Sequence, residues 1–184
     1  MTNVFYLSLE EIIEHLEIVK DEIDFNEVEA LINLILDAKK IFCYGAGRSG
    51  FIARCFTQRL MHIGLDAYYI GETITPGCGI GDLVVIVSGS GETASSVCMA
   101  RKALELGAKI VAITANPKGT LASLAHHILR VPGKTKLLER ESYAPFTSLF
   151  DIAVLAVVDS ISSELMRRLG RGEDYILKRH ATLE

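Results

Sequence analysis

The chain has no tryptophan, only four prolines and no long apolar run among its 184 residues. Its longest uninterrupted apolar stretch, 152–158, is far too short to span a bilayer, so the sequence predicts no transmembrane helix. Three glutamates, Glu10, Glu11 and Glu14, lie where a signal peptide would carry its apolar region. We therefore expect a cytosolic protein that makes no contact with a membrane.

Cysteine is sparse as well, and the sequence contains no C-x-x-C pair. The free thiols are expected to behave as small apolar side chains in or beside strands and helices. A zinc site would need closely spaced ligands, and the neighbouring His126 and His127 lie beside an apolar strand instead. We therefore expect no disulfide, no metal and no other cofactor. The four cysteines are Cys43, Cys55, Cys78 and Cys98.

Strong charge of either sign is also missing, since the formal net charge is -4. That value argues against a general nucleic-acid binder. It leaves a phosphate ligand possible, because a helix dipole and one arginine outweigh a mild global charge at close range. The length fits one domain with a substantial core.

The most informative stretch is Ser-Gly-Ser-Gly-Glu-Thr at 88–93. It follows a β-branched run of strand length, 82–87, and precedes a helical pattern over 94–106. Glycines allow close backbone approach, and the free N–H groups and dipole of a helix start favour an anion. An ordinary N-cap needs one hydroxyl, whereas this turn has three. The pattern predicts a phosphate site with the hydroxyls of Ser88, Ser90 and Thr93.

A second strand–turn–helix unit carries Gly-Ala-Gly-Arg-Ser-Gly at 45–50. It also fits the dinucleotide pattern G-x-G-x-x-G, with Glu72 near the expected acidic position. NAD binding would not explain the hydroxyl-rich turn, and the length leaves little room for a separate substrate domain. We therefore assign Gly47, Arg48 and Ser49 to the phosphate site, with Arg48 as a clamp on phosphate or a sugar hydroxyl.

Strands alternate with helices along most of the chain, which predicts a single α/β domain with a five-stranded parallel sheet and helices on both faces, as in flavodoxin-like or Rossmann-like folds. Extra N-terminal helices occupy 1–38, the sheet core 39–133, and C-terminal helices with a tail 147–184. The charged stretch 134–144 is expected to be a mobile loop or lid. The expected strands are 41–44, 67–70, 82–87, 109–114 and 128–131. The expected helices are 8–20 (opened by a capping box of Ser8 and Glu11), 25–38, 51–63, 94–106, 120–125, 147–169 and 173–179.

The two Gly/Ser turns together resemble the sugar isomerase (SIS) domain. Three further motifs resemble 6-phospho-3-hexuloisomerase, so that the resemblance covers nearly the whole chain from Val19 onward. It implies a tetramer that interconverts arabino-hex-3-ulose 6-phosphate and fructose 6-phosphate without metal or nucleotide, in formaldehyde fixation by the ribulose monophosphate pathway or in its reverse. The three motifs are Arg-Leu-Met-His-Ile-Gly at 59–64, Gly-Glu-Thr-Ile-Thr-Pro at 71–76 and Lys-Arg-His-Ala-Thr-Leu-Glu at 178–184.

The chain departs from this family at the start of its long helix. There the family usually has Gly-Ser/Thr-x-Phe-Glu, and this chain has Thr-Ser-Leu-Phe-Asp at 147–151. If the family glutamate is an acid/base residue, the shorter Asp151 takes its place. Two alternatives therefore stay open: another aldose–ketose phosphosugar isomerase of the same fold, and a non-catalytic sugar-phosphate sensor.

Isomerisation requires a proton to leave one carbon and return to its neighbour through an enediolate, so a base is needed. The carboxylate candidates are Glu92, Glu72 and Asp151, although a carboxylate in a first helical turn also simply complements the dipole. With the family resemblance, His180 is predicted to be catalytic rather than a residue of a solvated tail. Since an outward tail does not fill its own pocket, His180 is predicted to enter the site of a neighbouring subunit. His62 is expected to be structural.

Overall fold

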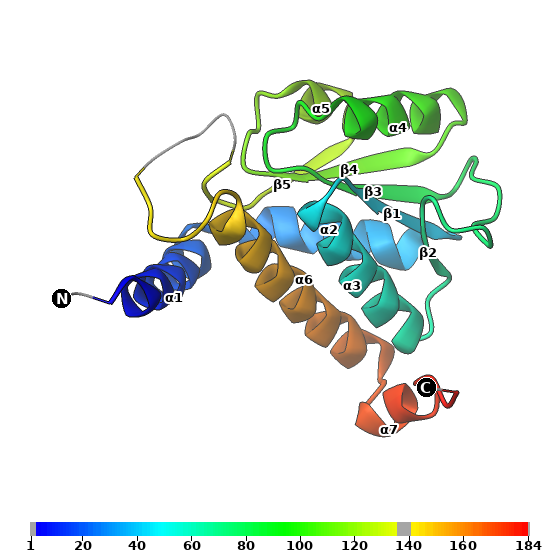
Figure 1. Ribbon diagram of the computed structural model, residues 1–184. Helices are drawn as coiled ribbons and strands as arrows, with labels where there is room; N and C mark the ends of the chain where they lie inside the picture. The colour runs from blue at the N-terminus through cyan, green and yellow to red at the C-terminus, as the bar shows by residue number, and fades with distance from the viewer. Residues whose placement is uncertain (1–2, 136–140, 184) are drawn as a thin grey trace.

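The computed structural model describes residues 3–135 and 141–183. Within them lies a five-stranded parallel sheet in the order β2-β1-β3-β4-β5 (Figure 1). This confirms the predicted fold class, and the order is that of flavodoxin-like folds. The strands are β1 (Ile41–Gly45), β2 (Ala67–Tyr69), β3 (Leu83–Val87), β4 (Lys109–Thr114) and β5 (His127–Arg130).

Helices cover both faces of the sheet, which is why the central strands are apolar on both sides. In β3, Val85 faces the core cluster under α2, α3 and α6, whereas Val84 and Ile86 face the cluster under α4 and α5 (Figure 1). This alternation is the period of two of an extended strand. The helices are α1 (Val4–Glu22), α2 (Phe25–Asp37), α3 (Arg48–His62), α4 (Ala94–Glu105), α5 (Thr120–Leu124), α6 (Ser148–Leu169) and α7 (Glu173–Leu177).

The first helix begins earlier than the sequence pattern predicts. Asn3 is the N-cap of α1, and its side chain accepts a hydrogen bond from the Phe5 N–H. The capping box expected at Ser8 is therefore wrong. The carboxylate of Glu11 instead accepts hydrogen bonds from the N–H groups of Tyr143 and Ala144, far along the chain.

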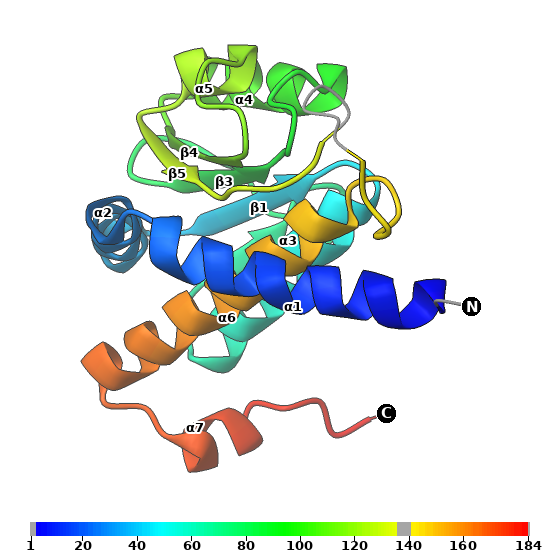
Figure 2. The ribbon, with the colours of Figure 1, turned by 90° about the vertical axis from the view of Figure 1, so that its left-hand side faces the viewer.

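The two N-terminal helices have different environments. Helix α2 contributes the fully buried Leu31, Ile32 and Ile35 to the core. Helix α1 lies across α6 (Figure 2), and His15 and Val19 are its buried residues. The outer face of α1 is strongly apolar and exposed, through Val4, Phe5, Tyr6, Leu9 and Ile13.

The remaining expectations concern the cysteines and the charged loop. Cys43 is buried in β1, and burial raises the pKa of its thiol to about 12, so it is an apolar core residue as expected. Cys55 and Cys98 are exposed on α3 and α4, which corrects that expectation for them.

Part of the predicted lid, 136–140, lies outside the described residues. None of the helices within the described residues is long and apolar enough to cross a membrane.

The α3–α6 packing provides a test of the core. Leu60 of α3 is fully buried, so Leu60→Ala should lower the free energy of unfolding by about 2–5 kcal/mol through lost burial and an unfilled cavity. Leu104→Ala, at a position of α4 that is 37% exposed, is the control and should cost about 1 kcal/mol or less. Urea unfolding measures both. Equal losses for the two variants would contradict the assigned core.

Candidate active site

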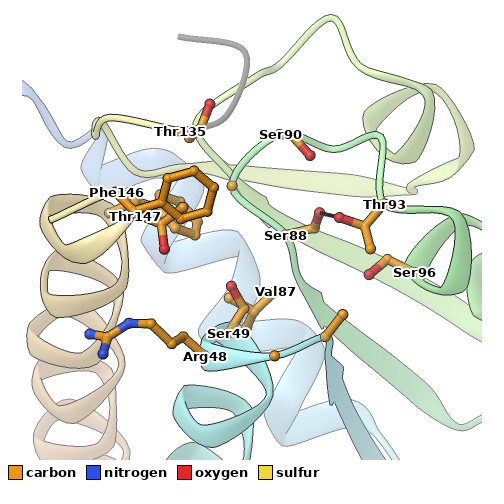
Figure 3. Close-up of a pocket in the computed structure, with 14 residues that line it drawn as sticks. Arg48, Ser49, Val87, Ser88, Ser90, Thr93, Ser96, Thr135, Phe146 and Thr147 are labelled. Atoms are coloured by element: carbon orange, nitrogen blue, oxygen red, sulfur yellow. Dashed lines mark hydrogen bonds between the residues drawn. The ribbon is translucent and has the colours of Figure 1, made fainter. Parts of the chain in front are cut away.

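A pocket of about 320 Å³ opens at the carboxyl ends of β1 and β3 (Figure 3). The chain runs from β1 to β2 on one side and then to β3 on the other side of β1. The loops after β1 and β3 therefore diverge toward opposite faces and leave a crevice, the usual ligand position in such sheets. All six residues predicted for phosphate binding line this pocket: Gly47, Arg48, Ser49, Ser88, Ser90 and Thr93.

The loop after β1 is shaped by its glycines. Gly47 has φ 59° and ψ −130°, a conformation that side chains other than hydrogen rarely allow, and α3 begins at the next residue. A Cβ on Gly50 would lie 2.7 Å from the carbonyl oxygen of Gly45. The glycines therefore allow α3 to start directly against the end of β1, three residues earlier than the sequence pattern predicts.

The loop after β3 presents hydroxyl groups that the fold itself uses little. The Ser88 and Thr93 hydroxyls are 3.5 Å apart, a long hydrogen bond. Thr93 is the N-cap of α4, yet its side chain makes no capping hydrogen bond. The Ser90 hydroxyl accepts a hydrogen bond from the Glu92 N–H at 3.2 Å, which leaves its proton for another acceptor.

Three helices begin at this pocket. The N-cap residues Gly47, Thr93 and Thr147, of α3, α4 and α6, all line it. Gly47 has no side chain to cap its helix, and the two threonines make no capping hydrogen bond. The first N–H groups of each helix carry partial positive charge. Arg48 is the charged side chain in the lining. This arrangement favours a compact anion such as a phosphate group.

Asp151 joins two of these helix starts. Its carboxylate, in the first turn of α6, is fully buried and accepts three side-chain hydrogen bonds. The donors are Arg48 Nε at 3.1 Å, Ser49 Oγ at 3.1 Å and Thr147 Oγ1 at 2.8 Å. Since an ionised carboxylate only accepts, the Ser49 proton is used here, and Ser49 is available to a phosphate through its backbone N–H.

Asp151 was predicted as a catalytic candidate, and that role stays a prediction; its carboxylate accepts hydrogen bonds from Arg48 and Ser49. It is buried behind the pocket rather than part of its lining. Sequence position alone gave no signal for these hydrogen bonds, because the donors at 48 and 49 lie about 100 residues away in the chain.

Glu92 points toward α5, away from the pocket. Its two carboxylate oxygens accept hydrogen bonds from the backbone N–H and the hydroxyl of Thr120, at 2.7 and 2.6 Å. The side-chain and backbone hydrogen bonds from Thr120 lower the pKa of Glu92, which weakens it as a base.

Glu72 lies at the same edge of the sheet, one strand away from the pocket. Its carboxylate pairs with Arg54, whose guanidinium carbon lies 3.8 Å from the centre of the Tyr69 ring. These residues line a separate groove beside β2, together with the exposed Phe51 and Ile74. Glu72 is half exposed and open to solvent.

His180 lies far from the pocket of its own chain. Its ring stacks on His62 with ring centroids 5.3 Å apart, and His62 is the last residue of α3. Because the pocket is at the first residue of that helix, His180 is about 20 Å away along the α3 axis. His62 is buried, as expected for a structural residue. The predicted entry of His180 into a neighbouring site stays a prediction.

Several pocket residues were missed by the sequence reasoning. Thr135 and Phe146 come from an irregular segment without periodicity, and Phe150 was assigned to the buried helix alone. Ser96 had a usable signal, since it follows Thr93 by three residues and so shares its helix face. Among the described residues, no three His, Cys, Asp or Glu side chains are grouped closely enough to hold a metal ion.

Comparison with known proteins agrees with this geometry. Residues 34–158 match the model of the SIS domain. The chain is 40% identical to a 3-hexulose-6-phosphate isomerase of Bacillus subtilis (86% of this chain, 87% of the relative) and 40% identical to one of Methanocaldococcus jannaschii (86% and 84%). It is also similar to a Methanococcus jannaschii protein whose crystal structure led to an inferred function as 3-hexulose-6-phosphate isomerase, with TM-score 0.83, 36% identity and coverage of 96% and 98%.

The Asp151 contacts lead to a prediction for Asp151→Asn. The neutral amide should lower the free energy of unfolding by about 1.5–3 kcal/mol, since hydrogen bonds to a charged group are weakened. Arg48 and Ser49 should then be held less firmly, so KM for the sugar phosphate should rise more than kcat falls. Urea unfolding and steady-state kinetics measure the two effects.

A matched control lies on the same helix. Asp159 accepts a hydrogen bond from Arg59 Nε at the same 3.1 Å, but both side chains are nearly half exposed, so Asp159→Asn should cost less than about 1 kcal/mol. A fall in kcat of about 10²–10⁴ with KM unchanged would instead identify Asp151 as the acid or base.

Proposed function

The chain belongs to the SIS-domain family and, within it, to the 3-hexulose-6-phosphate isomerases, and from this premise we propose that it interconverts arabino-hex-3-ulose 6-phosphate and fructose 6-phosphate. The observation that supports this site assignment is the convergence of three helix N-termini and the two Gly/Ser turns on one pocket. Two alternatives are another aldose–ketose phosphosugar isomerase of the same fold and a non-catalytic sugar-phosphate sensor. The first experiment below distinguishes them.

In this proposal the phosphate group lies at the N-terminus of α4. The hydroxyls of Ser88, Ser90 and Thr93 donate to its oxygens, and the first N–H groups of α4 complete the set. Across the pocket, the Arg48 side chain is held at Nε by Asp151 and lies on the α6 side (Figure 3). In the proposed complex its terminal nitrogens turn to the phosphate or a sugar hydroxyl. The site binds the phosphate firmly and so places carbons 2 and 3 of the sugar at a fixed position.

The chemical step moves a proton between neighbouring carbons. A base removes the proton from carbon 2, beside the carbonyl at carbon 3, and the electrons form an enediolate. A second acid/base group moves the hydroxyl proton from the oxygen of carbon 2 to that of carbon 3, and the first proton returns at carbon 3, which leaves the carbonyl at carbon 2. Asp151 is buried behind the pocket and Glu92 is hydrogen bonded to Thr120 on its far side, so we propose neither as the base. Glu72, half exposed at the same sheet edge, is the carboxylate we favour; it acts as base when the bound sugar reaches the groove beside β2 and Glu72 is released from Arg54.

The second acid/base group is His180 from another copy of the chain. His180 lies about 20 Å from the pocket of its own chain along α3, and for this reason we place it in the site of an adjacent subunit. The exposed apolar face of α1, with Phe5 67% and Ile13 53% exposed, supports an assembly in which a copy covers it. We propose a homotetramer with active sites shared between subunits, in the cytoplasm.

The first test is a coupled assay. Hexulose-phosphate synthase makes the substrate from formaldehyde and ribulose 5-phosphate, and we expect added protein to produce fructose 6-phosphate, with synthase alone as the blank. The absence of product despite thermal stabilisation by fructose 6-phosphate would contradict the proposed substrate. A panel of other sugar phosphates would then separate a sister isomerase, which turns one over, from a sensor, which binds without turnover.

A subunit-mixing experiment tests the role of His180. His180→Ala alone, and the double variant Ser88→Ala/Ser90→Ala alone, should each have low activity at substrate levels below KM. Co-expression should restore activity, because some sites then combine intact serines of one chain with intact His180 of another. Mixed oligomers that stay as inactive as the parents would show that His180 does not act across subunits.

A further inference from the structure

Ser96 carries a hydroxyl that the fold leaves unused. It is the third residue of α4, its side chain is fully buried, and its Oγ has no hydrogen-bond partner. It also lines the pocket, and Figure 3 shows its oxygen directed toward the pocket interior, on the same wall as Ser88 and Thr93. A buried hydroxyl without a partner lowers stability, so its retention requires an explanation.

Three serines of α6 are satisfied by their own helix. On α6, Ser160, Ser162 and Ser163 each donate to the carbonyl oxygen four residues earlier, at 2.7–3.1 Å. Four residues before Ser96 stands Glu92, which precedes the first turn of α4. The carbonyl three residues earlier, that of Thr93, accepts the Val97 N–H, and neither carbonyl takes a hydrogen bond from Ser96 Oγ.

The direction of the side chain identifies its partner. The Cα–Cβ bonds of a helix tilt toward its N-terminus, so the hydroxyl of Ser96 lies at the same end of α4 as the first-turn N–H groups. Thr93, three residues earlier, projects from the same helix face. An anion at this helix start would meet Ser88, Thr93 and Ser96 together.

We propose that Ser96 is a further binding residue of this site and donates its hydroxyl proton to a phosphate oxygen of the bound sugar phosphate. The inference rests on the proposed function, because it places the phosphate group of that substrate at α4. Ser96 adds a buried hydroxyl donor to the proposed donors Ser88, Ser90 and Thr93. A phosphate with three terminal oxygens has acceptor sites enough for all four hydroxyls.

The test compares Ser96→Ala with Ser162→Ala. Both serines are buried in helices, but the Ser162 hydroxyl is satisfied by the Val158 carbonyl on α6, which makes it a matched control. Ser96→Ala should weaken binding of inorganic phosphate and of fructose 6-phosphate about tenfold by calorimetry, while its ligand-free melting temperature is unchanged or higher. Ser162→Ala should leave both affinities unchanged and lower the melting temperature slightly.

The outcomes separate this inference from the proposed function. Wild-type protein that binds neither ligand would overturn both. Wild-type binding that weakens in Ser90→Ala but not in Ser96→Ala would overturn the Ser96 contact alone. Should Ser96→Ala fail to fold, Ser96→Cys keeps the side-chain shape with a larger atom and a weaker donor, and wild-type affinity in that variant would equally overturn the contact.

Discussion

The buried carboxylate of Asp151 is the interaction on which the pocket depends. Asp151 joins two of the three helix starts at the pocket, those of α3 and α6, through its hydrogen bonds from Arg48, Ser49 and Thr147. Its carboxylate also complements the partial positive charge of these two helix starts. All three donors are at hydrogen-bond distance from this fully buried side chain, so an added methylene would have to displace packed neighbours.

The described chain separates binding from chemistry. Its pocket has donors for an anion, from two loops and three helix starts, and a single charged residue, Arg48, in its lining. The two groups proposed for proton transfer lie elsewhere. Glu72 lines the groove beside β2, and His180 lies at the opposite end of α3. In the proposed function, phosphate binding therefore needs one folded chain, whereas catalysis depends on how copies of the chain are arranged. In the proposed assembly, a further copy covers the exposed apolar face of α1.

Sequence reasoning succeeded where the determinants are local. The β-branched runs at 82–87 and 109–114 predicted strands, and the structure has β3 and β4 there. The glycines and hydroxyls of the two turns predicted six binding residues, and all six line one pocket. It failed where a side chain makes its hydrogen bonds to a residue far away in the sequence. The Glu92 carboxylate accepts a hydrogen bond from Thr120, and the carboxylate of Glu11, expected in a capping box, accepts one from Tyr143. Such pairings leave no periodicity in the sequence, because they exist only after the sheet has brought the loops together.

The places where local rules fail are themselves concentrated at the pocket. Thr93 leaves its helix uncapped, Ser96 has an unpaired buried hydroxyl, and Phe146 adopts φ 46°, unusual for a large side chain. Elsewhere, the N-caps Asn3 and Asp24 and the buried Ser162 all satisfy their helices. Departures of this kind persist when a function requires them. In the proposed complex, a phosphate group with several acceptor oxygens satisfies the open donors of α4 at once, so the stability lost in the free protein is regained on binding.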